Sequence, residues 1–258
     1  MQQTRLIISQ KETIAPAWWR LTLTAPDLTA LGQPGQFLLL ACADRFTCYL
    51  RRPIFPQPQP DQQFSLLIRP DPDPGLAWLT TRQVDDRLDV IGPLGSGFNL
   101  PAGIQNLLLI SDNQWLAPLL GVMEQAVAAG LSVTMALGAR RSADLYPVAA
   151  LPPVVEFQAA TLDGSLGHAG QLTDLLPDLL PWADRVCAVG STRLYRAIRT
   201  QTEAVRFGKA TGFAYGLWAD LPLPCGVGAC YSCTRYTNAG AKLTCLDGPV
   251  FDLTELEI

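Results

Sequence analysis

Four cysteines near the C-terminal end carry the clearest chemical pattern in the sequence. Cys225, Cys230, Cys233 and Cys245 follow the spacing C-x4-C-x2-C-x11-C, with glycines between the first two. Glycine lets the backbone turn closely around a bulky group and aim its N–H groups inward. Such N–H groups tune an iron–sulfur cluster by hydrogen bonding to its sulfur atoms, and this spacing is the plant-type signature. We therefore predict that these four cysteines ligate a [2Fe–2S] cluster.

Zinc and disulfide bonds are the alternatives for the same cysteines. Structural zinc sites usually present two short cysteine pairs, whereas here the fourth cysteine stands alone and the first loop is rich in glycine. Disulfides are typical of secreted proteins. The first ten residues contain no apolar core of a signal peptide, so we expect reduced thiols and a cytoplasmic location.

The run PCGVGACYSC, followed by CLDGPVF, resembles the C-terminal domain of a known family. The family is the electron-transfer subunit of the NAD-linked, two-subunit dihydroorotate dehydrogenases, which are flavin reductases of the ferredoxin-reductase superfamily. The resemblance implies an FAD-binding barrel and a [2Fe–2S] cluster. It also implies a hetero-oligomer with a catalytic subunit that contains FMN and oxidises dihydroorotate to orotate.

Arg52 is the first candidate for binding a flavin. It precedes a proline, which holds its backbone extended, and a guanidinium can bind a pyrophosphate through two hydrogen bonds. Taken alone, an arginine at a strand end is more often an ordinary surface residue. The family has Arg-Pro-Ile-Ser at this place. The resemblance therefore implies that Arg52, Pro53, Ile54 and Phe55 contact FAD, with Phe55 in place of the serine.

The family's second FAD segment is a strand that ends in a Gly-x-Gly-Thr turn. The corresponding residues are Leu67, Ile68 and Arg69, followed after a proline-rich run by Gly75 and Leu76. One glycine remains and the threonine is gone. Because prolines lack an N–H group, we expect this loop to offer fewer donors to the FAD phosphates than the family's loop does.

The nicotinamide-binding motifs of the family are the ones this sequence departs from most. A glycine-rich turn normally follows the first strand of that domain and lets phosphates approach a helix N-terminus. Here residues 111–116 read SDNQWL, which places Asp112 and Trp115 where glycines are expected. The family's Cys-Gly-Pro is reduced to Gly190 alone. We expect the chain to keep the fold but to bind NAD(P) weakly or not at all.

The remaining sequence predicts the elements that would position these sites. Short runs of alternating polarity indicate a β-barrel over residues 1–100. Residues 92–98 (GPLGSGF) resemble the family's turn at this place, which implies that they close the barrel. Alternating strands and helices indicate a doubly wound α/β domain over 101–219, as in ferredoxin–NADP reductases, and residues 220–258 form the cluster domain. The predicted strands are 5–9, 18–24, 37–41, 64–68, 87–91, 106–110, 132–137, 154–159 and 185–189, and the predicted helices are 116–129, 192–206 and one from 172.

Composition excludes several classes of protein. The chain of 258 residues has a formal net charge of −4 and no basic run, so we expect no nucleic-acid partner. Its most apolar stretch, 115–139, contains Glu124, Gly121 and Gly130 and is not expected to span a membrane. Charged residues make up only 16% of the chain. This low value fits a surface covered by another subunit, and ordinary compositional bias explains it equally well.

These patterns predict an electron carrier rather than a complete enzyme. No pair of residues stands out as a catalytic acid and base, so we expect no catalytic residue in this chain. The sole histidine, His168, lies in a glycine-rich turn, and Cys42, Cys48 and Cys187 lie in apolar runs typical of buried free thiols. Two alternatives remain open: an NAD(P)H-dependent reductase for another acceptor, and a non-catalytic scaffold that holds a metal for stability.

Overall fold

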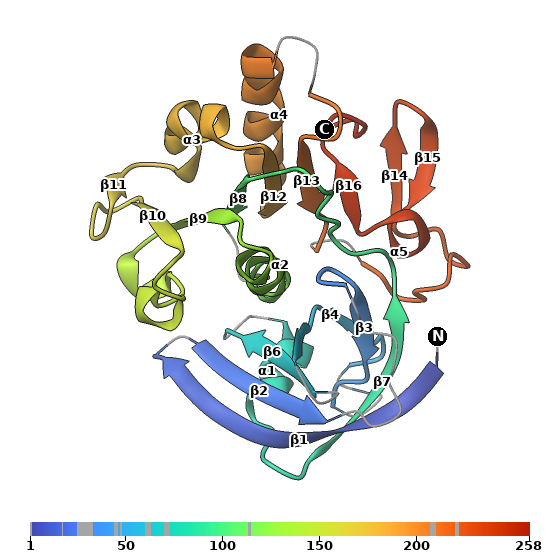
Figure 1. Ribbon diagram of the computed structural model, residues 1–258. Helices are drawn as coiled ribbons and strands as arrows, with labels where there is room; N and C mark the ends of the chain where they lie inside the picture. The colour runs from blue at the N-terminus through green and yellow to red at the C-terminus, as the bar shows by residue number, and fades with distance from the viewer. Residues whose placement is uncertain are drawn as a thin grey trace.

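The computed structural model describes residues 2–16, 18–24, 33–43, 46, 48–59, 63–69, 73–112, 115–206, 210–219 and 222–258. Figure 1 shows three parts: a curved antiparallel sheet, a second sheet flanked by helices, and a C-terminal loop and hairpin beside both. No helix in the described part of the chain is long and apolar enough to cross a membrane.

The N-terminal part is one antiparallel sheet with the strand order β4-β3-β7-β1-β2-β6-β5. Side chains along β1 alternate in direction, so Leu6 and Ile8 point into the core while their neighbours face solvent. This pattern is expected for a sheet with one buried and one solvent-exposed face. Its elements are β1 (Gln2–Ala15), β2 (Trp18–Thr24), β3 (Phe37–Leu40), β4 (Arg52–Ile54), β5 (Gln57–Gln59), β6 (Gln63–Ile68), β7 (Arg87–Leu94) and the helix α1 (Pro74–Thr80).

The second part is a mainly parallel sheet with the order β11-β10-β9-β8-β12-β13-β16. The chain runs outward from β8 through β9 to β10, then returns to place β12 on the other side of β8. Its elements are β8 (Asn106–Ser111), α2 (Ala117–Ala128), β9 (Ser132–Ala139), β10 (Glu156–Thr161), β11 (His168–Ala169), α3 (Leu176–Trp182), β12 (Arg185–Val189), α4 (Thr192–Arg206), β13 (Ala214–Leu217) and β16 (Val250–Asp252), with 3-10 turns at Ser142–Asp144, Val148–Ala150 and Leu172–Leu175.

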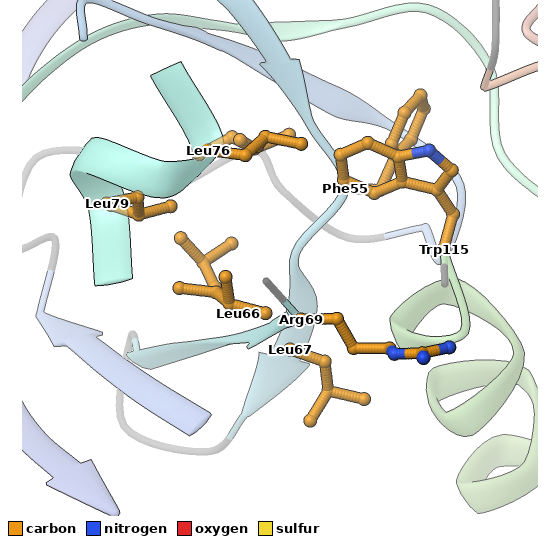
Figure 2. Close-up of a pocket in the computed structure, with 9 residues that line it drawn as sticks. Phe55, Leu66, Leu67, Arg69, Leu76, Leu79 and Trp115 are labelled. Atoms are coloured by element: carbon orange, nitrogen blue, oxygen red, sulfur yellow. The ribbon is translucent and has the colours of Figure 1, made fainter. Parts of the chain in front are cut away.

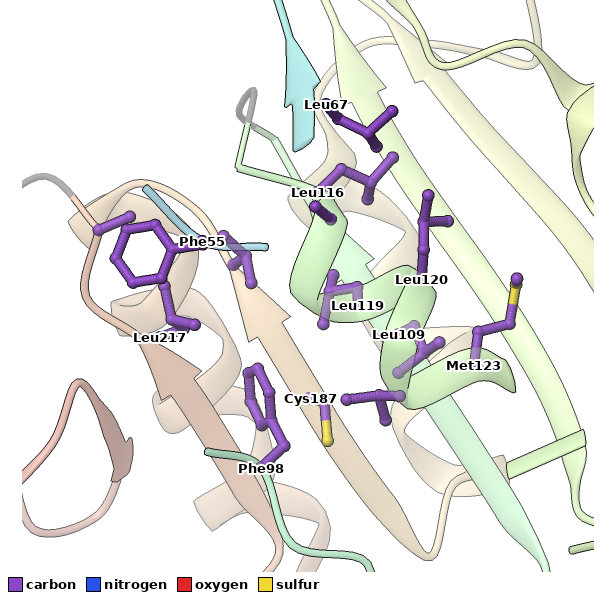
Figure 3. Close-up of a cluster of buried hydrophobic side chains, with 14 of the residues drawn as sticks. Phe55, Leu67, Phe98, Leu109, Leu116, Leu119, Leu120, Met123, Cys187 and Leu217 are labelled. Atoms are coloured by element: carbon purple, nitrogen blue, oxygen red, sulfur yellow. The ribbon is translucent and has the colours of Figure 1, made fainter. Parts of the chain in front are cut away.

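Helix α2 joins the two parts. It lies between the parallel sheet and the curved sheet, and its apolar side chains share one buried cluster with residues of both (Figure 3). Gly121 permits this close approach, because a Cβ atom there would lie 3.0 Å from the Cγ atom of Pro34. Labelled members of the cluster are Phe55, Leu67, Phe98, Leu109, Leu116, Leu119, Leu120, Met123, Cys187 and Leu217.

The predicted fold class is confirmed, and the differences lie in short or irregular elements. Helix α1 was not predicted, because the proline-rich run before it suggested only a loop. Asp73 caps this helix and Pro74 begins it. The strand predicted at 154–159 begins instead at Glu156, since Val154 is exposed. Strand β16 comes from the C-terminal segment yet pairs antiparallel with β13, so this segment is anchored to the second sheet.

Candidate functional site

The fold brings the four predicted ligand cysteines together in two pairs, Cys225 with Cys230 and Cys233 with Cys245. The hairpin of β14 (Thr234–Thr237) and β15 (Gly240–Leu243) returns the chain so that Cys245, in the short helix α5 (Thr244–Asp247), lies beside Cys233. Thr244 fixes this return, since its N–H and its hydroxyl both donate to the carbonyl of Cys233, at 3.1 and 2.8 Å. Cys233 and Cys245 are buried, Cys225 is half-buried and Cys230 is exposed.

Hydrogen bonds around the sulfur atoms make the thiols unequal. Burial acts to raise the pKa of Cys225, but N–H groups of Val227, Cys230 and Ala229 and the thiol of Cys230 lower it to about 6. Burial and the hydrogen bond to Cys233 raise the pKa of Cys245 to about 12. Coordination to a metal deprotonates a thiol outright, so both would act as thiolates with iron bound.

The sulfur atoms form two pairs, Cys225 with Cys230 and Cys233 with Cys245. In the described part of the chain, no group of three or more His, Cys, Asp or Glu side chains has the arrangement that a metal ion requires. A [2Fe–2S] cluster has four cysteine ligands shared between two irons. Two thiol pairs, with the N–H of Gly228 directed at the sulfur of Cys245 at 3.3 Å, fit such a cluster.

Two glycines in the cluster loop adopt left-handed backbone conformations that other residues rarely accept. Gly226 has φ +65° and Gly228 has φ +74°. Gly226 is also pressed against the curved sheet: a Cβ atom there would lie 2.7 Å from a Cδ atom of Leu94 and 2.8 Å from one of Leu39. The loop therefore takes its shape from its own glycines and its position from contact with β3 and β7.

A pocket between the two sheets collects most of the predicted FAD residues (Figure 2). It lies at the ends of β4 and β6 and its wall is almost wholly apolar. Its free volume of about 20 Å³ is less than a flavin ring system fills, so the pocket would have to widen to admit one. Arg52, Pro53 and Gly75 lie beside it rather than in its wall, and Gly75 is close enough that a Cβ atom there would lie 2.8 Å from the Cγ atom of Arg52. The wall contains Ile54, Phe55, Leu66, Leu67, Ile68, Arg69, Leu76, Leu79 and Trp115.

Arg69 supplies the polar group of this pocket. Its side chain stacks on Trp18, 5.2 Å from the ring centroid, and forms an ion pair with Asp144 at 3.4 Å. Its Nε–H is buried and has no hydrogen-bond partner among the described residues. A buried donor without an acceptor is costly, so this atom fits an acceptor group on a ligand.

Arg52 already holds an anion, the carboxylate of Asp73, at 2.8 Å from its Nε. The same carboxylate accepts from the N–H groups of Gly75 at 2.8 Å and Leu76 at 3.1 Å. Partial burial opposes ionisation, but these bonds outweigh it and lower the pKa of Asp73. We expected this loop to offer few N–H donors to the FAD phosphates. Two N–H groups, those of Gly75 and Leu76, are present, but the carboxylate of Asp73 accepts both.

Phe55, which replaces the family's serine, packs between aromatic rings. Its ring centroid lies 6.0 Å from that of Phe37 and 5.5 Å from that of Trp115, the latter in an edge-on arrangement. Trp115 does fill space at the start of α2, as expected from the loss of glycines there. Asn113 and Gln114 of that loop lie outside the described residues.

Sequence patterns missed two residues that shape these sites, Asp73 and Leu39. An aspartate followed directly by proline is a helix-start signal, which would have revealed α1 and its cap. Leu39 carries no signal at all, because its importance comes from contact with a loop far away in the chain. His168 was expected in a turn but lies in the short strand β11, with its ring Nε2 3.2 Å from a carboxylate oxygen of Asp174.

Comparison with known proteins agrees with this geometry. Residues 223–257 match the family model described as the iron-sulfur cluster binding domain of dihydroorotate dehydrogenase B. The chain is 32% identical to the dihydroorotate dehydrogenase B (NAD(+)) electron transfer subunit of Geobacillus thermodenitrificans, over 98% of this chain and 97% of that one. This chain belongs to that family. The subunit of Bacillus caldolyticus is 31% identical over the same shares of the two chains.

Two solved structures share the fold of this chain. An NADH-dependent reduced ferredoxin–NADP oxidoreductase superposes with a TM-score of 0.80 at 23% identity, covering 98% of this chain and 89% of that one. A ferredoxin–NADP reductase from Neisseria gonorrhoeae superposes with a TM-score of 0.65 at 16% identity, covering 80% and 92%. The family and the ferredoxin-reductase-like fold expected from the sequence are both confirmed.

Proposed function

We propose that this chain passes electrons between an FAD, a [2Fe–2S] cluster and the catalytic subunit of a dihydroorotate dehydrogenase, in pyrimidine biosynthesis. The observation that carries the proposal is the contact between the cluster loop and the strand beside the flavin pocket. Leu39 of β3 touches the position of Gly226 and pairs with Pro53 of β4. A single strand therefore separates the two proposed cofactor sites.

The apolar wall of the pocket would enclose the flavin ring and exclude water, while Arg69 and Arg52 would bind its polar groups. The four cysteines would hold the cluster, with the N–H group of Gly228 directed at a ligand sulfur. When bound, a flavin exchanges electrons in pairs and a cluster singly, so the two together join paired to single electron transfer. The protein sets the distance and the environment.

The chemistry on the organic substrate is assigned to the partner. Among the described residues that line the proposed flavin pocket, only Arg69 is ionisable, and an arginine does not release its proton in proteins. These described wall residues thus offer no acid–base pair for the substrate chemistry. The relatives are named as electron transfer subunits, which supports a hetero-oligomer with a catalytic subunit.

We also propose the division into an FAD-binding part (1–100), a nicotinamide-type part (101–219) and a cluster part (220–258). A cytoplasmic location is proposed on the basis of the cysteines, all seven of which are free thiols, as cluster ligands and buried thiols require. The two alternatives, a reductase for another acceptor and a scaffold without electron transfer, predict different behaviour with the partner.

The test mixes the purified chain anaerobically with a dihydroorotate dehydrogenase catalytic subunit and dihydroorotate, and follows visible absorbance. We expect the flavin and cluster absorbance of this chain to bleach only when both the partner and dihydroorotate are present. If dithionite bleaches the chain but partner and dihydroorotate leave it unchanged, the proposed partner is wrong. A colourless protein that contains zinc would support the scaffold instead.

A further inference from the structure

We propose that Asp112 closes the dinucleotide crevice of this subunit, so that it exchanges no electrons with NADH or NADPH. The curated relatives carry NAD(+) in their names, so this property would set the chain apart from them. The inference rests on the proposed function, because the flavin and cluster supply one of its readouts.

The location of Asp112 follows from the topology of the second sheet. In open α/β sheets, ligands bind beyond the carboxyl ends of the strands, where the strand order reverses. Here the order β10-β9-β8-β12-β13 reverses between β8 and β12. Asp112 directly follows β8, and Gly190 and Ser191 directly follow β12. The carboxylate therefore stands at the switch point itself.

Asp112 bridges the two strand ends. One carboxylate oxygen accepts from the backbone N–H of Ser191 at 2.8 Å, and the other accepts from the Ser191 hydroxyl at 2.6 Å. The N–H of Gly190 is also used, donating to the hydroxyl oxygen of Tyr195 at 2.8 Å. Two N–H groups that a phosphate before α4 could otherwise use, those of Gly190 and Ser191, are thus committed to groups of the protein.

The Asp112 carboxylate also occupies the space over Gly190 that a dinucleotide phosphate would need in order to approach the backbone. A Cβ atom built on Gly190 would collide with the Oδ1 atom of Asp112, which shows that this oxygen lies directly over the glycine. A dinucleotide diphosphate at this point would displace the carboxylate from its two hydrogen bonds to Ser191 or lie against it. Like charges in contact disfavour binding strongly.

Two cavities lie on either side of Asp112. On one side of Asp112 a cavity of about 450 Å³ is lined by Arg140, Arg193 and Thr173. On the other side a cavity of about 250 Å³ reaches Arg69, which also lines the proposed flavin pocket. A ligand in this crevice would therefore be continuous with the flavin, and the two arginines favour an anion. Neutralising Asp112 should open an existing path.

The experiment measures binding by isothermal titration of NADH, NADPH and ADP-ribose into the purified holoprotein. ADP-ribose carries the diphosphate without the nicotinamide and so reports on the phosphate position alone. We expect no binding to the wild-type protein at millimolar ligand, and binding at least about tenfold tighter for Asp112→Asn, which removes the charge at nearly constant size. Asp178→Asn, which removes an exposed charge on α3, is the matched control and should leave binding unchanged.

A second readout mixes the wild-type protein with NADH anaerobically and follows the visible spectrum. Wild-type protein whose flavin and cluster bleach with NADH would overturn the inference, as would a folded Asp112→Asn variant that binds no more tightly. Should that variant fail to fold, the wild-type titrations decide alone. Absence of any flavin and cluster absorbance would instead contradict the proposed function, so the two failures are distinguishable.

Discussion

Leu39 of β3 and Gly226 of the cluster loop lie in direct contact: a Cβ atom on Gly226 would be 2.8 Å from the Cδ1 atom of Leu39. The contact joins the two proposed cofactor sites, because Leu39 also pairs with Pro53 of the flavin motif. Electron transfer between bound cofactors depends on such fixed spacing, which the fold provides without a flexible connection.

Gly226→Ala is expected to disturb the cluster loop through this contact. The added methyl group meets Leu39 and Leu94, and φ +65° is unfavourable for alanine. We expect a loss of about 2–4 kcal/mol in stability and a lower iron content. Gly240→Ala is the control, since it has φ +102° but nothing within 4 Å, and it should cost only about 1–2 kcal/mol. Thermal unfolding and iron analysis compare the two, and equal losses would show that the contact is unimportant.

Cys230→Ser tests the cluster ligands. Cys230 is exposed and lies outside the packed core, so its replacement should remove cluster absorbance while flavin stays bound and the fold remains intact. Cys48→Ser changes a buried cysteine outside the loop and should leave the cluster spectrum unchanged. Unchanged iron content and colour in Cys230→Ser would refute its role as a ligand.

Arg69→Ala tests the flavin pocket. Removal of the unpartnered Nε donor and its charge should weaken FAD binding by about ten- to a hundredfold, which corresponds to the loss of one hydrogen bond to a charged group. Arg82→Ala removes an arginine from the connection between α1 and β7, where it stacks on Trp78, and should not affect FAD. Flavin fluorescence after dialysis measures retention, and equal retention in both variants would place FAD elsewhere.

Cys187 makes the stability of the protein sensitive to alkaline pH. Complete burial beneath α2 raises the pKa of this thiol from 9.0 to about 12. Its contribution is therefore fully present below pH 9 and is lost as the pH rises toward 12, because the unfolded state ionises first. The slope from this group is at most about 1.4 kcal/mol per pH unit. Urea unfolding at several pH values measures the free energy of unfolding against pH. Between pH 9 and 12 this free energy should fall less steeply in Cys187→Ala than in the wild-type protein, and identical slopes in the two would contradict the assignment.

The sequence predicted those features that depend on local pattern. Cysteine spacing located the cluster loop. Alternating polarity predicted the first sheet, and the alternation of strands with helices predicted the second. The predicted bounds of β2 and β12 match the observed bounds at both ends. Local sequence patterns do not show which residues far apart in the chain will be in contact. The bond between Asp112 and Ser191, and the contact of Leu39 with Gly226, join residues far apart in sequence. The loss of the family's glycines identified Asp112 and Trp115 as residues of interest but did not show which contacts they make.

The central claim is that one chain holds a flavin and a two-iron cluster in electronic contact. Anaerobic dithionite titration of the purified protein, followed by visible and electron paramagnetic resonance spectroscopy alongside iron, sulfide and FAD analysis, tests it most directly. The account predicts FAD, iron and sulfide in the ratio of about 1:2:2 and an uptake of about three electrons per chain, two by flavin and one by cluster. A protein that contains zinc, lacks flavin or takes up no electrons would contradict it.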